Sequence, residues 1–325
     1  MIIYNLFFKY FIGINMILIS FSPLFFSDLI MIWFFMEISN FLFISLLNMS
    51  MTRKKFIFLY FFIQIMSSFI IIYVIIMSNF FMMNNFLNFL ILTALFMKLG
   101  LPPFHLWMPL MSQTLSWIIL FFLLTILKLS PFYMLSLIKL NFFFIYLTLI
   151  LTCSIPPYMM INNNNFKSLM AYSSINQSGW MIMLIYTKNI IWLKYFLFYM
   201  MISLMLFAMI SSFKISMNSS LSTPFNLNMM PIIFMLNLAG MPPFSFFLMK
   251  WYSLYLILNN SNFLMILILM MISSLIMLYI YINMMIKSMF LNKFIFKFFI
   301  YTPNTLNYIF WNLFSLFMSL AILII

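Results

Sequence analysis

One short segment of the sequence places a charge, a helix break and the chain's single histidine together. It runs Lys98-Leu-Gly-Leu-Pro-Pro-Phe-His-Leu-Trp107, and its lysine follows a long apolar stretch. Glycine and proline end helices, so His105 follows directly on unwound backbone. A charged side chain at the centre of a bilayer costs about 3 kcal/mol. A plain membrane anchor has no use for such a segment, which therefore indicates chemistry at membrane depth.

The break has a second copy further along the chain. Gly240-Met-Pro-Pro-Phe244 repeats Gly100-Leu-Pro-Pro-Phe104 with an offset of 140 residues, and Lys250 follows the second copy closely. Two apolar segments interrupted at matching places are typical of transporters built from internal repeats, which bind their ions at the breaks. The sequence therefore predicts a transporter-like repeat with functional sites at both breaks.

Further charges lie inside apolar spans. Glu37 stands at mid-depth in one span and Lys128 in another, whereas the only other acid, Asp28, lies near the start of a span. Intramembrane ionisable residues usually mark ion pathways, which predicts a functional role for Glu37, Lys98, Lys128 and Lys250. The alternative is a neutralised structural pair of Glu37 with Lys98, together with lysines that extend to the membrane surface. Such extension works near helix ends, and Lys98 and Lys128 lie too deep for it.

These residue types suit proton transfer. Removal from water disfavours the charged form of a lysine, and a nearby carboxylate favours it again. Moving or neutralising that carboxylate would thus load or discharge the lysine. His105 would extend such a relay because imidazole titrates near neutrality; a structural hydrogen bond at the break is an equal alternative. The polar run Tyr172–Ser178 would line a hydrated path or form interhelical hydrogen bonds.

The composition is that of a membrane protein with many spans. Of its 325 residues, 67% are hydrophobic and 5% are charged, a pattern of long apolar runs. The net charge of +13 comes from single cations between these runs, so a nucleic-acid surface is excluded. One cysteine and one histidine exclude an intrachain disulfide, a four-cysteine iron–sulfur cluster and two-histidine haem ligation. No nucleotide-binding motif is present.

About eleven spans of roughly 20 residues or more are expected. They cover residues 2–21, 24–47, 56–78, 86–107, 112–139, 140–161, 167–187, 190–213, 229–258, 263–286 and 306–325. Breaks are expected at Pro102-Pro103 and Pro242-Pro243, and an interruption at Pro131. Most loop cations, such as Lys54 and Lys55, lie on the same side as the N-terminus. The positive-inside rule then places the N-terminus in the matrix and the C-terminus on the opposite side.

The choice of amino acids indicates a mitochondrial gene. Residues with AT-rich codons dominate, and the 37 methionines fit a code in which an isoleucine codon is read as methionine. The first span has neither a small-residue cleavage site nor an arginine-rich presequence. These features agree with synthesis inside the organelle.

Taken in order, these motifs resemble the chain 2 family of NADH-ubiquinone oxidoreductase, the antiporter-like membrane subunits of respiratory complex I. The resemblance is carried by Glu37, Lys98–Trp107, Ser116-Trp117, Lys128–Pro131, Ala171–Ile175, Gly179-Trp180, Gly240–Phe244 and Lys250-Trp251. It covers nearly the whole chain. The sequence departs from the family pattern at Leu110, where a carboxylate is common, and at Thr114, where a glycine is common. These departures put in doubt a local relay through that loop, but not the core charges.

The resemblance implies an all-α polytopic membrane fold with two inverted five-helix repeats, each with a discontinuous helix. Residues 1–139 would form the first repeat, 140–286 the second, and 287–325 a basic linker and a last span. By the same resemblance Glu37 and Lys98 would be a coupled pair, Lys128 the central relay and Lys250 the terminal lysine of the second half-channel.

The resemblance also implies a function and its setting. The chain would translocate protons across the mitochondrial inner membrane as a subunit of NADH:ubiquinone reductase, with its C-terminus in the intermembrane space. NADH, flavin, iron–sulfur clusters and ubiquinone would be bound by partner subunits, and no cofactor, metal or nucleic acid by this chain. Partners would be other membrane-arm subunits, including further antiporter-like ones, and lipids. A stand-alone cation/proton antiporter is the alternative, and a structural scaffold with locked charge pairs is a third.

Overall fold

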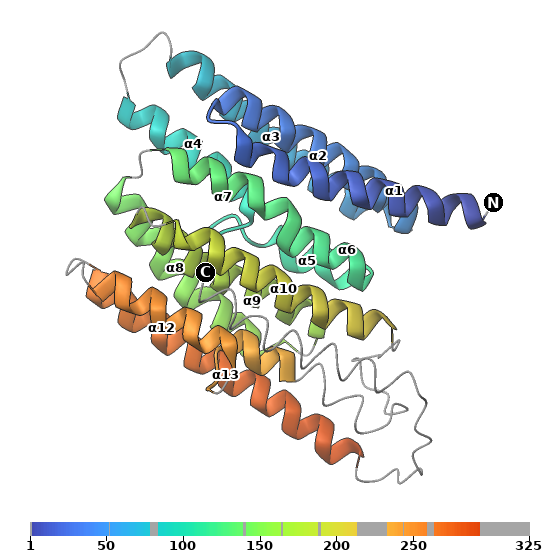
Figure 1. Ribbon diagram of the computed structural model, residues 1–325, viewed down its shortest axis with the longest axis vertical. Coiled ribbons are helices and arrows are strands. Elements are labelled where there is room, and N and C mark those ends of the chain that lie inside the picture. Colours follow the sequence, from blue (N-terminus) through green and yellow to red (C-terminus); the bar gives the residue numbers. More distant parts are fainter. Residues whose placement is uncertain are drawn as a thin grey trace.

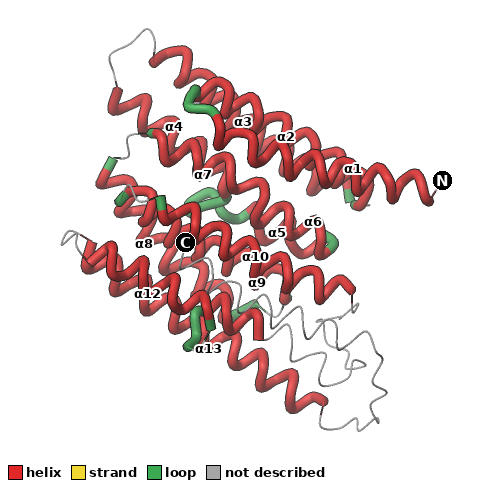
Figure 2. The backbone as a smooth tube through the Cα atoms, viewed as in Figure 1, coloured by secondary structure: helices red, strands yellow, loops and turns green. Residues whose placement is uncertain are grey.

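All regular structure in the described part of the chain is helical. The computed structural model describes residues 2–51, 53–78, 84–138, 141–163, 165–187, 190–212, 233–242, 244–258 and 263–292. Long helices lie alongside one another with a common tilt (Figure 1), and the loops and turns among the described residues are short (Figure 2). The expected all-α membrane fold is thus confirmed.

The first half of the chain contains several long helices, one of which is broken after Leu99. Its elements are α1 (Ile2–Phe21), a 3₁₀ turn (Ser22–Phe25), α2 (Leu29–Ser50), α3 (Lys54–Ser78), α4 (Asn84–Leu99), α5 (Trp107–Thr114), α6 (Trp117–Phe121), a π-helical turn (Phe122–Ile126) and α7 (Leu127–Leu137). Helix α2 packs between α1, α3 and α7, and α4 packs against α3 and α7. These contacts bring α2, α4 and α7, which carry the predicted charges, into one group.

The second half of the chain is also built of helices, packed around α9 (Phe166–Tyr186). Its elements are α8 (Phe142–Ile161), α9 (Phe166–Tyr186), α10 (Ile191–Ser212), a helical segment at 233–239, α12 (Ser245–Leu258) and α13 (Leu264–Asn292). Helices α8, α9 and α13 pack together, and α12 contacts α10 and α13. The halves meet where α9 packs on α5 and α7, and where α10 packs on α6.

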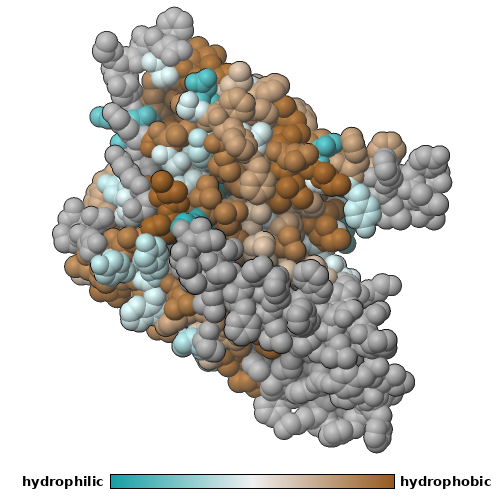
Figure 3. Space-filling model, in the orientation of Figure 1, coloured by the Kyte–Doolittle hydropathy of each residue, from teal (hydrophilic) through white to brown (hydrophobic). Residues whose placement is uncertain are grey.

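Seven of the described helical segments are long and apolar enough to cross a membrane. Apolar side chains cover most of the described part of the face seen in Figure 3, and the aromatic rings of Phe58, Phe62 and Phe69 project outward from α3. Such a surface suits contact with lipid tails. The count of eleven spans stays a prediction, since the span expected at 306–325 lies outside the described residues.

Helix α9 is the exception to this apolar pattern. It carries a run of serine, asparagine and glutamine, yet nearly all of its residues are buried. It contacts α5, α7, α8, α10 and α13. Because these neighbours shield it from lipid, its polar side chains find partners inside the protein. A helix with many polar side chains therefore lies inside the otherwise apolar core.

Both predicted helix breaks are present, and they begin at the glycines. Gly100 has φ 64° and Gly240 φ 80°, a conformation that glycine adopts without a steric penalty. The amides of Gly100 and Leu101 bond back to the carbonyls of α4 at 3.3 and 3.0 Å, the Schellman arrangement that ends helices. The prolines that follow lack an N–H and prevent the helix from resuming at once.

The interruption predicted at Pro131 is wrong. Helix α7 continues through Pro131 from Leu127 to Leu137, and the irregular turn lies just upstream, at Phe122–Ile126. A proline ring clashes with the carbonyl four residues before it, here that of Leu127, and leaves it without a partner amide. The wider π-helical turn immediately before Leu127 is the kind of adjustment that accommodates such a clash.

Candidate functional site

Helices α2 and α4 bring the predicted charge pair together. The Lys98 amine donates to Oε1 of Glu37 at 2.6 Å, and the two side chains are 2% and 13% exposed. Lys98 lies in the last turn of α4, directly before the Gly100 break. The end of a broken helix thus presents a cation to a carboxylate at mid-span of α2, a geometry that strengthens the hydrogen bond.

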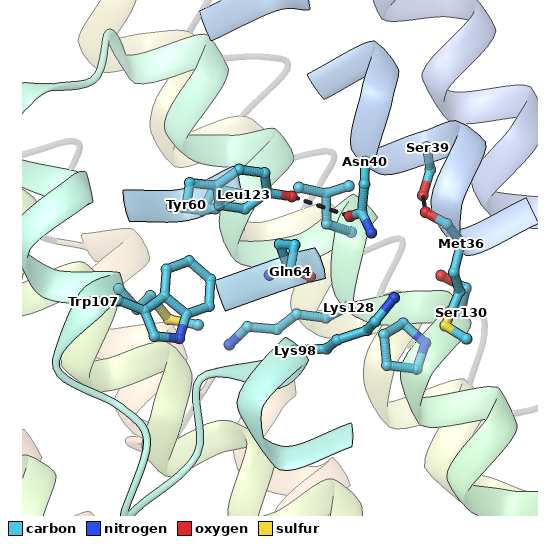
Figure 4. Close-up of a pocket in the computed structure, with 13 residues that line it drawn as sticks. Met36, Ser39, Asn40, Tyr60, Gln64, Lys98, Trp107, Leu123, Lys128 and Ser130 are labelled. Atoms are coloured by element: carbon cyan, nitrogen blue, oxygen red, sulfur yellow. Dashed lines mark hydrogen bonds between the residues drawn. The ribbon is translucent and has the colours of Figure 1, made fainter. Parts of the chain in front are cut away.

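A small pocket lies beside the side chains of Lys98 and the next lysine, Lys128 (Figure 4). Lys98 and Lys128 both line it, together with polar side chains of α2 and α3. It has room for about one water molecule. Because both lysines line this hydratable space, the pocket is a candidate step for proton transfer between them.

The pocket also contains two polar residues, Asn40 and Tyr60, that were not predicted from the sequence. The Tyr60 hydroxyl donates to Oδ1 of Asn40 at 3.1 Å, and both side chains line the pocket with Gln64 (Figure 4). Their spacing could have found them. Asn40 stands three residues after Glu37 and Gln64 four after Tyr60, so each pair shares one helix face.

Lys128 reaches from α7 to the central helix α9. Its amine donates to the Ser174 hydroxyl at 3.1 Å and to the Ser174 carbonyl at 3.3 Å. Both residues are buried, at 3% and 1% exposure. The serine within the polar run at Tyr172–Ser178 is therefore a partner for a lysine, which favours interhelical hydrogen bonding for this position.

Lys250 lies at the second break. Its amine donates to the Ala239 carbonyl at 2.6 Å, and so fills a free carbonyl at the end of the helical segment 233–239. The rings of Phe246 and Trp180 lie 5.7 and 6.0 Å from this amine, at the outer range of cation–π attraction. Lys250 has no carboxylate within ion-pair distance in the described residues.

His105 stands at the first break, away from the pocket. It is buried, its ring centroid lies 6.5 Å from that of Tyr172 in α9, and it is not among the residues that line the pocket. The Pro103 carbonyl lies nearby, but neither ring nitrogen forms a well-oriented hydrogen bond within the described residues. Its two expected roles, relay and structural bond, both stay predictions.

The structure thus gathers part of the predicted site and separates the rest. Lys98, which is paired with Glu37, and Lys128 line one pocket, whereas Lys250 lies at the other break. Within the described ranges, no three histidine, cysteine or acidic side chains are grouped as for a metal ion. A line of buried ionisable groups running past two broken helices is the arrangement of an antiporter-like ion translocator.

Comparison with known proteins agrees with this class. The family model described as NADH:quinone oxidoreductase/Mrp antiporter, TM, matches residues 27–277. The chain belongs to this family, and within it to the chain 2 subunits of NADH-ubiquinone oxidoreductase.

The relatives define this placement. The chain is 35% identical over 237 residues to NADH-ubiquinone oxidoreductase chain 2 of Anopheles gambiae, covering 67% of this chain and 68% of that one. With the Artemia franciscana protein of the same name it shares 32% over 258 residues, which is 73% and 79% of the two chains. The matched part spans about half the length of several other such relatives.

A solved structure shows the same fold. A chain of respiratory complex I from Thermus thermophilus, solved with bound aureothin, superposes with a TM-score of 0.70 at 20% identity. The match covers 81% of this chain and 66% of that chain. This match shows a shared fold, and the family match together with the candidate spans shows a multi-pass membrane protein.

Proposed function

We propose that this chain translocates protons across the mitochondrial inner membrane as a subunit of NADH:ubiquinone oxidoreductase, coupled at a distance to electron transfer from NADH to ubiquinone. The observation that carries the proposal is the Glu37–Lys98 ion pair at 2.6 Å, whose lysine lines a pocket together with the second buried amine, Lys128. A locked structural pair would not need a neighbouring lysine and a hydratable space. The membership of this chain in the family of antiporter-like complex I subunits supports the same function.

The first step follows from the charge pair. While Glu37 is ionised and in contact, it stabilises the ammonium form of Lys98. When the carboxylate moves away or is neutralised, Lys98 releases a proton into the pocket, because burial then favours the neutral amine. The water space and the polar side chains of Asn40 and Gln64 lie where that proton emerges.

The second step uses Lys128 and the central helix. The oxygens of Ser174 stabilise the charged form of Lys128 by accepting hydrogen bonds from its amine. From there α9 leads toward Lys250, whose amine rests on the Ala239 carbonyl. Lys250 is the terminal group of the relay, and His105 adds a branch at the first break.

The chain's organisation is part of the proposal. Residues 1–139 and 140–286 form two inverted five-helix repeats, and 287–325 a linker and last span, with the N-terminus in the matrix and the C-terminus in the intermembrane space. The two Schellman breaks with an offset of 140 residues support the repeat. The basic loop around Lys54 and Lys55 supports the orientation.

The redox chemistry belongs to partner subunits in this proposal. NADH, flavin, iron–sulfur clusters and ubiquinone are bound elsewhere, and this chain assembles with other membrane-arm subunits, further antiporter-like ones among them, and with lipids. The sequence supports this, since it carries no nucleotide-binding motif and a single cysteine.

An independent cation/proton antiporter is the competing function, because the matching family description also names Mrp antiporters. A native gel of mildly solubilised membranes, stained for NADH oxidation and analysed by mass spectrometry, separates the two. We expect this chain in the active band in stoichiometric amount with redox subunits. Its recovery alone in a small band, with ion exchange by the isolated chain in liposomes, would favour the antiporter.

A further inference from the structure

The second helix break has a specific set of partners for its carbonyl end. A helix leaves its last four carbonyls without partners inside the helix. At segment 233–239, the Gly240 and Met241 amides bond to the carbonyls of Asn237 and Leu236 at 2.9 and 3.2 Å. This is the Schellman arrangement, and it leaves the two final carbonyls to be satisfied by side chains.

Two side chains from different helices take these carbonyls. The Gln177 side-chain amide, from α9, donates to the Leu238 carbonyl at 3.0 Å. The Lys250 amine, from α12, donates to the next carbonyl, that of Ala239, at 2.6 Å. Gln177 and Lys250 therefore hold adjacent peptide groups, so the position of one carbonyl fixes the position of the other.

Gln177 is itself fixed. The Tyr195 hydroxyl of α10 donates to Oε1 of Gln177 at 2.6 Å, and the Tyr195 ring packs on Phe246 of α12 with centroids 5.0 Å apart. Gln177 and Tyr195 are buried, at 4% and 0% exposure. The amide of Gln177 can thus present only its N–H groups to the break, since its oxygen is taken by Tyr195.

The opposite end of the break is held separately. The amide of Phe246, in the first turn of α12, donates to Oδ1 of Asn237 at 3.1 Å. Asn237 therefore ties the start of α12 to the segment before the break. The Gln177–Tyr195 pair is not needed to join the two half-helices, and its contact bears on the carbonyls that face Lys250.

We propose that Gln177, oriented by Tyr195, is a positioning residue for Lys250: it fixes the Leu238 carbonyl, and with it the Ala239 carbonyl that holds the lysine amine. The proposal rests on the proposed role of Lys250 in proton transfer. Gln177 also lies three residues after Ser174, on the same face of α9. One face of α9 therefore carries Ser174, the partner of Lys128, and Gln177, which binds the break that contacts Lys250.

The test uses membranes that carry the assembled complex, with three variants of this chain. Gln177→Met keeps an unbranched side chain of similar length without its hydrogen bonds, and Tyr195→Phe removes one hydroxyl. Tyr133→Phe is the matched control, because the Tyr133 hydroxyl donates to the backbone carbonyl of Phe26 at 3.0 Å, far from this break. The readouts are the amount of assembled complex, and kcat and KM for NADH-driven ubiquinone reduction per assembled complex.

We expect Gln177→Met to lower kcat about three- to tenfold per assembled complex, the factor that one lost hydrogen bond corresponds to. Tyr195→Phe should lower it in the same direction but less, with the KM for ubiquinone unchanged in both and Tyr133→Phe like the unaltered complex. Normal kcat per assembled complex in Gln177→Met and Tyr195→Phe would overturn the proposal. This holds even if less complex assembled, because Gln177 and Tyr195 would then have only a structural role. Tyr195→Phe decides the matter should Gln177→Met not assemble.

A Lys250→Met variant separates this inference from the proposed function. Slow turnover in Lys250→Met with normal Gln177 and Tyr195 variants would contradict only the positioning role. Normal turnover in Lys250→Met would contradict the relay itself, and slow Gln177 variants would then act by another route, which overturns the positioning role as well.

Discussion

At the scale of single residues, the Glu37–Lys98 pair is where we expect a substitution to have the largest effect. The Lys98 side chain is buried, that of Glu37 is 13% exposed, and their charged atoms are 2.6 Å apart. A buried ion pair contributes little net stability, but removing one partner leaves an uncompensated charge and costs about 3–5 kcal/mol. Loss of function and loss of folding therefore have to be separated by experiment.

Lys98→Met is predicted to abolish proton pumping and to slow quinone-coupled NADH oxidation severely, and part of this effect will be reduced assembly. The double variant Glu37→Gln with Lys98→Met removes both charges, so assembly should recover while pumping stays absent. Native gels measure assembly, and the proton yield per NADH measures pumping. Near-normal turnover with unchanged proton yield in the double variant would refute the assignment of Lys98.

Lys128 offers a finer test, because only one of its two acceptors is a side chain. Ser174→Ala removes the hydroxyl at 3.1 Å and leaves the carbonyl at 3.3 Å. We expect turnover per assembled complex to fall about three- to tenfold. Ser178→Ala is the control, because the Ser178 hydroxyl donates to a carbonyl of its own helix. Equal turnover in both variants would mean that Ser174 does not assist Lys128.

At the scale of elements, the broken helices depend on glycines with positive φ. Gly240 has φ 80°, and a Cβ there would lie 2.8 Å from Cδ of Lys250 and 3.1 Å from its amine. Alanine would therefore strain the backbone by about 1–2 kcal/mol and displace the lysine as well. The break is thus built to bring backbone and amine closer than any other residue allows.

Gly240→Ala is predicted to lower both the thermal stability of the complex and its turnover. Gly13→Ala is the matched control, since a Cβ at Gly13 would meet only the Phe122 ring at 3.4 Å, in helix α1 and without a positive φ. That change should be neutral or stabilising by about 0.5–1 kcal/mol. Thermal unfolding of the detergent-solubilised complex, followed by turnover at 25 °C, distinguishes the two. Equal behaviour of both variants would contradict the strained break.

The breaks and the charge pair could be predicted because their signals are local. A Gly-x-Pro-Pro run ends a helix wherever it occurs, and a lysine and a glutamate inside apolar spans have to find partners. Pro131 was predicted wrongly because its effect depends on the upstream turn, which widens at Phe122–Ile126 and lets the helix continue. The partners of Gln177 could not be predicted, since Leu238 lies 61 residues away and the bond is to its backbone.

At the scale of the whole molecule, the two halves are joined through their most polar helix. Helix α9 contacts α5 and α7 of the first half and α8, α10 and α13 of the second. It supplies Ser174 to Lys128 and Gln177 to the second break. A displacement of α9 would therefore alter the surroundings of Lys128 and of Lys250 together, which is what a relay crossing both halves requires.

The orientation of the molecule in the membrane can be tested through its basic loop. Lys54 and Lys55 are exposed at the start of α3, whereas Lys98, Lys128 and Lys250 are buried. If the N-terminal side faces the matrix, a membrane-impermeant amine reagent should modify Lys54 and Lys55 in inside-out inner-membrane vesicles but not in right-side-out ones. The buried lysines should stay unmodified in both and serve as an internal control. Modification of Lys54 in right-side-out vesicles would reverse the orientation, and the excess of cations on that side would then oppose the positive-inside rule.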